Sequence, residues 1–187
     1  MIQTNLPHRR YMIMKSVWKR SFALFLCMMM LAVPFFASAE EAAEVPNVTE
    51  LLKEYTKLDL TPYLGKTVLL NFFTEWCPYC MQEMPDIKAI HELYDDEAFE
   101  VVFVHPWQNE DAQNTENVKA KYGLEDMIFF EDEDNLVTYI LGVPGFPTSV
   151  FLHPDGTIAA AAPFKITLDD LTMQLDQMGV PREAEAE

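Results

Sequence analysis

Short apolar runs along the chain predict the strands of a central sheet. Residues 67–74 and 99–105 are apolar almost throughout, which is typical of strands buried on both faces. A third, shorter run covers residues 127–130. Two further runs flank a turn that reads His-Pro-Asp-Gly, and this pattern predicts a β-hairpin. The hairpin covers residues 148–152, 153–156 and 157–161.

Between the strands, apolar residues recur at helical spacing. In residues 78–94 they stand three positions apart, which favours a helix with one buried face. The last helical segment, residues 167–178, has Thr167 as its cap and is followed by Gly179. Because strands alternate with helices, the pattern indicates an α/β sandwich. The other predicted helices cover residues 47–58, 111–122 and 136–141.

The first 39 residues have the three parts of an export signal. Residues 1–20 contain five basic residues, residues 21–39 carry no charge, and the segment ends in Ala37-Ser38-Ala39. We therefore predict a signal peptide over residues 1–39 and a periplasmic or otherwise extracytoplasmic protein. An uncleaved membrane anchor is the alternative, although the apolar run is short for a spanning helix.

One acidic domain is predicted to follow the signal. Beyond residue 39 the chain has 8 basic residues against 30 acidic ones, so nucleic acid is not an expected partner. The acidic run at residues 131–134 lacks the Gly and Glu of a calcium loop and predicts a solvated turn. The predicted parts are a linker with a short helix, the α/β domain and a disordered acidic tail, at residues 40–57, 58–180 and 181–187.

Cleavage of the signal would remove Cys27 and leave only Cys77 and Cys80. In an oxidising compartment such a pair bonds to itself, to a partner or to a metal ion. A disulfide that closes so small a loop stabilises a fold little, so we predict a chemical role for the pair. Zinc would need two further ligands at close spacing, and the histidines are scattered along the chain.

The cysteine pair lies where a strand runs directly into a helix. Cys77 is expected at the helix N-terminus, where free N–H groups and the helix dipole stabilise a thiolate. Pro78 suits the first helical position, because its missing N–H would have no partner there. We predict that Cys77 attacks a substrate disulfide and that Cys80 resolves the mixed disulfide. Exchange needs only these two thiols, so we expect no metal and no other cofactor.

Further motifs accompany the cysteine pair. They are Leu-Gly-Lys at 64–66, Val-Leu-Leu-Asn-Phe-Phe at 68–73, Trp-Cys-Pro-Tyr-Cys at 76–80, Glu83, Pro85, Gly-Val-Pro-Gly-Phe-Pro-Thr at 142–148 and Phe-Leu-His-Pro-Asp-Gly at 151–156. Together they resemble the thioredoxin superfamily over residues 58–178, and most closely its TlpA/ResA-type extracytoplasmic disulfide reductases. The resemblance implies a thioredoxin-like fold, with a central mixed sheet flanked by helices. It also implies a cis Pro147 that faces the cysteines, beside backbone that pairs with an extended substrate chain.

The residues that adjoin the cysteines and the proline are further candidates for the site. Trp76 precedes the pair, and Phe146 precedes the proline. The dipeptide between the cysteines is Pro78-Tyr79, as in glutaredoxins. Because this dipeptide tunes the redox potential, the direction of electron flow is less constrained than the chemistry.

The proton acceptor for Cys80 departs from the thioredoxin pattern. Cytoplasmic thioredoxins carry a buried Asp on the strand before the motif, whereas this chain has Asn71 there. Glu75 and Glu83 are the candidates that remain. A solvated charge is the simpler interpretation of Glu75.

The resemblance implies a protein-disulfide oxidoreductase that works in the reducing direction. Its expected partners are protein disulfides and a membrane electron donor, and its implied substrates include apocytochrome c thiols in haem-attachment motifs. Two alternatives remain open at this point. One is a disulfide donor or isomerase, and the other is a metal- or haem-handling module that uses the dithiol as ligands. The oligomeric state is not predicted.

Overall fold

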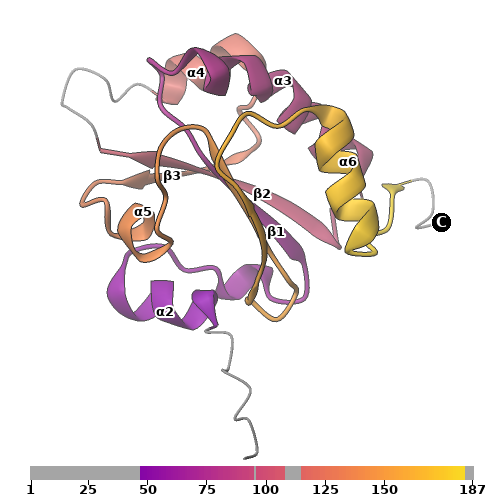
Figure 1. Ribbon diagram of the computed structural model, residues 1–187, viewed down its shortest axis with the longest axis horizontal. Coiled ribbons are helices and arrows are strands. Elements are labelled where there is room, and N and C mark those ends of the chain that lie inside the picture. Colours follow the sequence, from indigo (N-terminus) through magenta and orange to yellow (C-terminus); the bar gives the residue numbers. More distant parts are fainter. Residues whose placement is uncertain (1–46, 95, 108–114, 184–187) are drawn as a thin grey trace, which may run out of the picture. The chain divides into compact units, whose positions relative to one another are not determined.

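The computed structural model describes residues 47–94, 96–107 and 115–183 (Figure 1). Four predicted segments lie wholly or partly outside these residues. No helix in the described part of the chain is long and apolar enough to cross a bilayer. The segments outside are the predicted signal peptide, residues 40–46 of the linker, residues 111–114 of a predicted helix and residues 184–187 of the tail.

A five-stranded mixed sheet forms the centre of the domain. Its strands are β1 (Thr67–Phe72), β2 (Phe99–Pro106), β3 (Ile128–Asp132), β4 (Thr148–Leu152) and β5 (Ile158–Ala162). They lie in the order β3-β2-β1-β4-β5. The strand β2 is parallel to β1 and β3, whereas β4 is antiparallel to β1 and β5. Every residue of β1 is buried, because β1 is the middle strand of a sheet covered on both faces.

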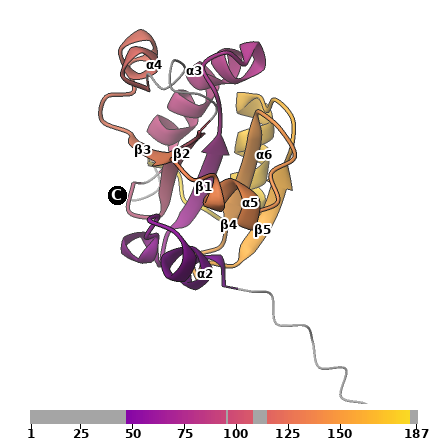
Figure 2. The ribbon, with the colours of Figure 1, turned by 90° about the vertical axis from the view of Figure 1, so that its left-hand side faces the viewer.

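Helices cover both faces of the sheet (Figures 1 and 2). They are α2 (Val48–Tyr55), the 3₁₀ helix η1 (Thr61–Tyr63), α3 (Pro78–Leu93), α4 (Thr115–Tyr122), α5 (Leu136–Ile140) and α6 (Leu168–Gln177). Residues of α3, α4 and α6 share one core, and residues of α2 and α5 share the other. This arrangement confirms the predicted α/β, thioredoxin-like fold, with a mixed sheet between two layers of helices.

The alternation of side chains along β1 divides the core in two. Leu69 and Phe73 point to the side of α3 and α6, whereas Leu70 and Phe72 point to the side of α2 and α5. Asn71 has the same parity as Leu69, so it faces α3. A polar side chain is thereby buried under the helix that carries the cysteines.

Helix α2, the short N-terminal helix that the sequence predicts after the linker, packs into the domain. Asn47 caps the helix by accepting a hydrogen bond from the N–H of Glu50. The N–H of Val48 donates to the carbonyl of Gly156 at 2.9 Å, which ties the helix to the β4–β5 hairpin. Val48 and Leu52 are buried in the core beside β1. The domain therefore begins about ten residues earlier than the predicted boundary at 58.

The C-terminal boundary also differs from the prediction. Thr167 caps α6 in a capping box with Asp170, as the sequence predicts for this threonine. Beyond the helix, the guanidinium of Arg182 donates to Asp176 at 2.7 Å and lies over the ring of Tyr94. Because of these contacts, Arg182 belongs to the folded domain rather than to the predicted disordered tail.

The acidic run at residues 131–134 is a solvated turn only in part. Asp132 is buried, with 1% of its surface exposed. Its carboxylate accepts hydrogen bonds from the N–H groups of Val137 and Thr138. These bonds satisfy free amides in the first turn of α5, so the prediction is wrong for Asp132.

Candidate active site

The site lies at the end of the sheet where β1 leads into α3. Because β4 is antiparallel to β1, the start of β4 reaches the same end, and Phe72 pairs with Thr148 there. The motif at 76–80 and the proline at 147 are therefore brought together, although about 70 residues separate them in the sequence. This proximity follows from topology and not from local sequence.

Cys77 is the N-cap of α3, and Pro78 occupies the first helical position. Of the three states that the sequence leaves open for the pair, the structure contains the disulfide between Cys77 and Cys80, with 5.3 Å between the two Cα atoms. The sulfur of Cys77 accepts a hydrogen bond from the N–H of Cys80 at 3.2 Å. In the reduced protein this donor and the helix dipole stabilise a thiolate at Cys77. Both cysteines are buried in the oxidised protein, with 3% of Cys77 exposed and none of Cys80.

The proline loop lies directly against the disulfide. The Phe146–Pro147 peptide bond is cis, as the resemblance implies. The carbonyl oxygen of Phe146 lies 3.5 Å from the sulfur of Cys77. A polypeptide that reached Cys77 would thus meet the backbone of this loop at the same time.

Aromatic side chains surround the sulfur pair. Trp76 and Tyr79 are exposed, with 59% and 61% of their surfaces accessible. The ring of Trp76 meets the ring of Phe146 edge to face, with centroids 6.3 Å apart. Phe164 is also exposed, and it follows β5, whose final residues lie at the same end of the sheet as Thr148. Exposed aromatic groups of this kind are typical of surfaces that bind other proteins.

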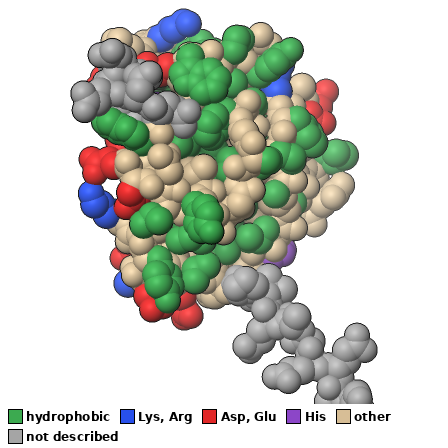
Figure 3. Space-filling model, turned by 60° about the vertical axis from the view of Figure 1, so that its left-hand side comes forward, with side chains coloured by type: hydrophobic (Ala, Val, Ile, Leu, Met, Phe, Trp, Pro, Cys, Tyr) green, Lys and Arg blue, Asp and Glu red, His purple; other side chains and the backbone are tan. Residues whose placement is uncertain are grey.

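Charged side chains are distributed differently from these exposed aromatic side chains. On the face shown in Figure 3, hydrophobic side chains are scattered among polar ones, and acidic side chains lie toward its margins. The chain as a whole has a net charge of -17.

Glu83 is a fully buried carboxyl group one helical turn after Cys80. One of its oxygens accepts a hydrogen bond from the side-chain amide of Asn71 at 2.8 Å. The other accepts a hydrogen bond from the N–H of Ile166 at 3.1 Å. Burial outweighs these two donors and raises the pKa of Glu83 to about 7. Of the two candidate acceptors, Glu83 therefore has the buried position and the tuned pKa that a proton acceptor near neutral pH needs.

Glu75 differs from the solvated charge that we expected. The side chain is half-buried, and its Oε1 atom is buried and accepts no hydrogen bond from the described residues. It precedes Trp76 in the connection between β1 and α3.

Two residues of the site were not identified from the sequence. Ser149 accepts a hydrogen bond from the amide of Asn71 at 3.1 Å, and Ile166 donates its N–H to Glu83. Ser149 lies opposite Asn71 in the β1–β4 register. The sequence indicates both strands, but only the register shows that these two side chains meet.

The described residues contain no group of three or more His, Cys, Asp or Glu side chains that could hold a metal ion. Two described histidines are paired with carboxylates: His91 of α3 with Glu100 of β2, and His105 of β2 with Glu131 of β3. Thioredoxin-like oxidoreductases use their cysteine pair without a cofactor, and the Cys77–Cys80 pair has the geometry for this.

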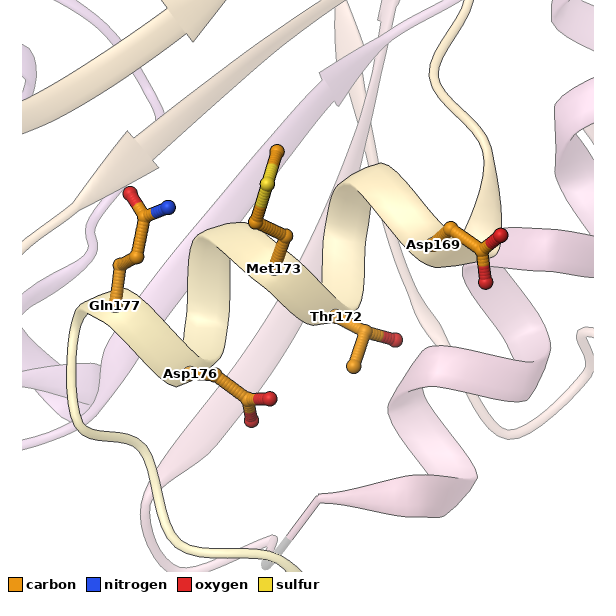
Figure 4. A pocket seen from close by; sticks show the side chains of 5 residues that line it. All are labelled: Asp169, Thr172, Met173, Asp176 and Gln177. Atoms are coloured by element: carbon orange, nitrogen blue, oxygen red, sulfur yellow. The ribbon is translucent and has the colours of Figure 1, made fainter.

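A shallow hollow of about 500 Å³ lies along the outer side of α6 (Figure 4). None of the residues of the site described above lines it. It is therefore separate from the sulfur chemistry. The lining residues are Asp169, Thr172, Met173, Asp176 and Gln177.

Comparison with known proteins agrees with this geometry. Residues 40–167 match the Redoxin family. The chain is 30% identical over 128 residues to the thiol-disulfide oxidoreductase ResA of Bacillus anthracis. The aligned region covers 66% of this chain and 72% of that protein. It is 28% identical over 119 residues to ResA of Geobacillus thermodenitrificans, covering 64% and 67%. A secreted Mycobacterium tuberculosis disulfide oxidoreductase homologous to E. coli DsbE shares the fold, with a TM-score of 0.55 at 24% identity over 64% of this chain and 87% of that chain.

Proposed function

Because the chain belongs to the Redoxin family, we propose that this thiol–disulfide oxidoreductase of thioredoxin type reduces protein disulfides outside the cytoplasm. The observation that carries the proposal is the position of Cys77. Its sulfur caps α3, is joined to Cys80 and lies beside the carbonyl of Phe146. The resemblance to extracytoplasmic disulfide reductases supports the reducing direction.

In the first step the reduced protein attacks its substrate. The thiolate of Cys77 forms a bond to one sulfur of a substrate disulfide, and the other substrate sulfur leaves as a thiolate. The product is a mixed disulfide between Cys77 and the substrate. The exposed rings of Trp76 and Tyr79 and the backbone at Phe146 would hold the substrate chain during this step.

In the second step Cys80 resolves the mixed disulfide. Its thiol transfers a proton to the carboxylate of Glu83, and the resulting thiolate attacks the sulfur of Cys77. The substrate leaves as its second thiolate, and Cys77 and Cys80 form a disulfide. Two electrons have then passed from the protein to the substrate. A thiol donor must reduce the protein again, and we propose a membrane protein in this role.

The location and the substrate are parts of the same proposal. The signal-like residues 1–39 and the description of the Mycobacterium tuberculosis protein as secreted both support export. Among protein substrates, the TlpA/ResA resemblance favours apocytochrome c with its haem-attachment cysteines joined as a disulfide, which the reaction would convert to thiols.

Replacing Cys80 with Ser is expected to trap the mixed disulfide, because no sulfur then remains to release the substrate. Expressed with its leader in a bacterial host, the C80S variant should give reductant-sensitive adducts on a gel, and mass spectrometry would identify the trapped proteins. The C77S variant is the matched control and should trap far less. Adducts that are equally abundant with C77S, or absent with C80S, would contradict the roles of the two cysteines.

The reduction potential decides the direction of electron flow. We expect a value near that of thioredoxin, about −270 mV, measured by equilibration with glutathione or dithiothreitol redox buffers. A disulfide donor is the second candidate, because the N-cap position of Cys77 stabilises the reduced form and so raises the potential. A measured value near that of a strong oxidant, about −120 mV, would favour the donor instead.

A further inference from the structure

Asn71 joins three elements beneath the cysteine pair. It lies on β1 and is fully buried. Its side-chain nitrogen donates to Glu83 of α3 at 2.8 Å and to the hydroxyl of Ser149 of β4 at 3.1 Å. Both protons of the amide group are thus used, one toward each partner.

The two partners give the amide of Asn71 a defined orientation. The oxygen of Ser149 accepts from the amide nitrogen, so the nitrogen end of Asn71 faces both Ser149 and Glu83. The Oδ1 atom of Asn71 is buried and accepts no hydrogen bond from the described residues. The nitrogen of the amide thus has two acceptors, whereas its oxygen has no donor among the described residues. This orientation favours the hydrogen bond to the carboxyl group of Glu83.

The position of Glu83 gives this contact a chemical meaning. Cys80 and Glu83 stand three residues apart on α3, so they lie on the same face of the helix, which is the face turned toward Asn71. The charged groups that act on Glu83 are Lys165, which precedes α6, and Asp86 on α3 itself. Asn71 is different from both, since it touches the carboxyl group and does not titrate.

We propose that Asn71 is a positioning residue for the resolving step: its amide, held by Ser149, keeps Glu83 oriented as the acceptor of the Cys80 proton. This inference rests on the proposed function. In the step, the S–H bond of Cys80 breaks and its proton goes to the carboxylate. The electron pair left on that sulfur forms the bond to Cys77, and the substrate sulfur leaves with the electrons of the broken disulfide.

The test is the pH dependence of resolution in the Asn71→Leu variant of the full domain. Reduced protein is mixed with oxidised glutathione and quenched with acid, and mass spectrometry quantifies the mixed and the intramolecular disulfides at each pH. Loss of a donor to a buried carboxylate is expected to move the midpoint of resolution upward by about one pH unit. At pH 7 the ionised fraction of Glu83 would fall from about one half to about one tenth, so resolution should be about fivefold slower.

Two comparisons separate positioning from simple destabilisation. Ser149→Ala frees the amide but keeps its contact with Glu83, so we expect a smaller shift in the same direction. Thr138→Val removes a partly buried hydrogen bond to Asp132 that is far from Glu83 in the chain, and it should lower stability without moving the midpoint. Ser149→Ala also keeps the test decisive if Asn71→Leu does not fold, because an unshifted midpoint in that variant overturns the inference.

A rescue experiment tests the position itself. In a Glu83→Gln protein, the further change Asn71→Asp places a carboxylate at the same contact under α3. We expect it to restore part of the resolution rate that Glu83→Gln removes. An unchanged pH profile in Asn71→Leu, or no recovery in the double variant, overturns the role of Asn71. If the wild-type protein forms no mixed disulfide with glutathione at all, the proposed function fails instead.

Discussion

Glu83→Gln is expected to slow resolution of the mixed disulfide by about a hundred- to ten-thousand-fold, the range that general acid–base catalysis supplies. Gln has the shape of the carboxyl group, and its single oxygen accepts the bond from either Asn71 or Ile166, but it takes no proton from Cys80. The measurement is the accumulation of mixed disulfide with oxidised glutathione near pH 8. The attack by Cys77, measured in the C80S background, should change little.

The same substitution should make the folded protein more stable at alkaline pH. The pKa of Glu83 is raised to about 7, whereas an exposed Glu in the unfolded chain titrates near 4.5. The folded state therefore keeps a proton that the unfolded state has lost, so stability is full below pH 4.5 and falls as the pH rises through about 7. Above that range the loss is about 3 kcal/mol, and Gln removes it.

Unfolding in urea at pH 4.5 and pH 8 measures this effect on the oxidised protein. The gain from Glu83→Gln should be present at pH 8 and absent at pH 4.5. Glu92→Gln is the matched control, since Glu92 lies on the same helix with an exposed side chain paired to Lys88. If Glu83→Gln resolved mixed disulfides at the wild-type rate and had the wild-type pH dependence, Glu83 would not be the proton acceptor.

Gly156→Ala is expected to lower the free energy of unfolding by about 2–4 kcal/mol. Gly156 lies in the β4–β5 turn at a φ of +83°, a conformation that an L side chain rarely adopts. A Cβ atom there would come within 2.5 Å of the Thr49 hydroxyl and 2.8 Å of the Asn47 side-chain oxygen. The methyl group would thus push against the capped end of α2.

Gly179→Ala is the control for this substitution. Gly179 also has a positive φ, of +74°, but a Cβ atom there meets nothing within 4 Å. Only the backbone conformation is then unfavourable, and the loss should be about 1 kcal/mol. Denaturant midpoints of the two variants measure the difference. Equal losses would show that α2 and the hairpin are not held together as tightly as the contact distances imply.

Much of the fold could be predicted because its signals are local. The run at 67–74 is apolar on both faces, and Thr167 stands where a helix cap is required, so the central strand and the last helix were identified correctly. Asp132 was misassigned because composition indicates polarity but not burial. Its carboxylate is used inside the domain to accept hydrogen bonds from two N–H groups in the first turn of α5.

The residues of the candidate site also fall into two groups: those that the sequence predicts and those that only the folded chain reveals. Cys77, Cys80 and the cis Pro147 carry recognisable motifs, and the structure brings them together. The contacts of Glu83 carry none, because they depend on the β1–β4 register and on the path of the loop before α6. Ser149 and Ile166 are ordinary residues at ordinary sequence positions, and only the folded chain brings them to Asn71 and Glu83.

The attachment of α2 to the hairpin determines where the chain enters the domain. Asn47 bridges Thr157 beside the tip of the β4–β5 turn, whereas Cys77 and Pro147 lie at the opposite pole of β1 and β4. The first described residue therefore lies at the pole remote from the exchanging sulfurs, and the N-terminal end of α2 leaves the approach to Cys77 open.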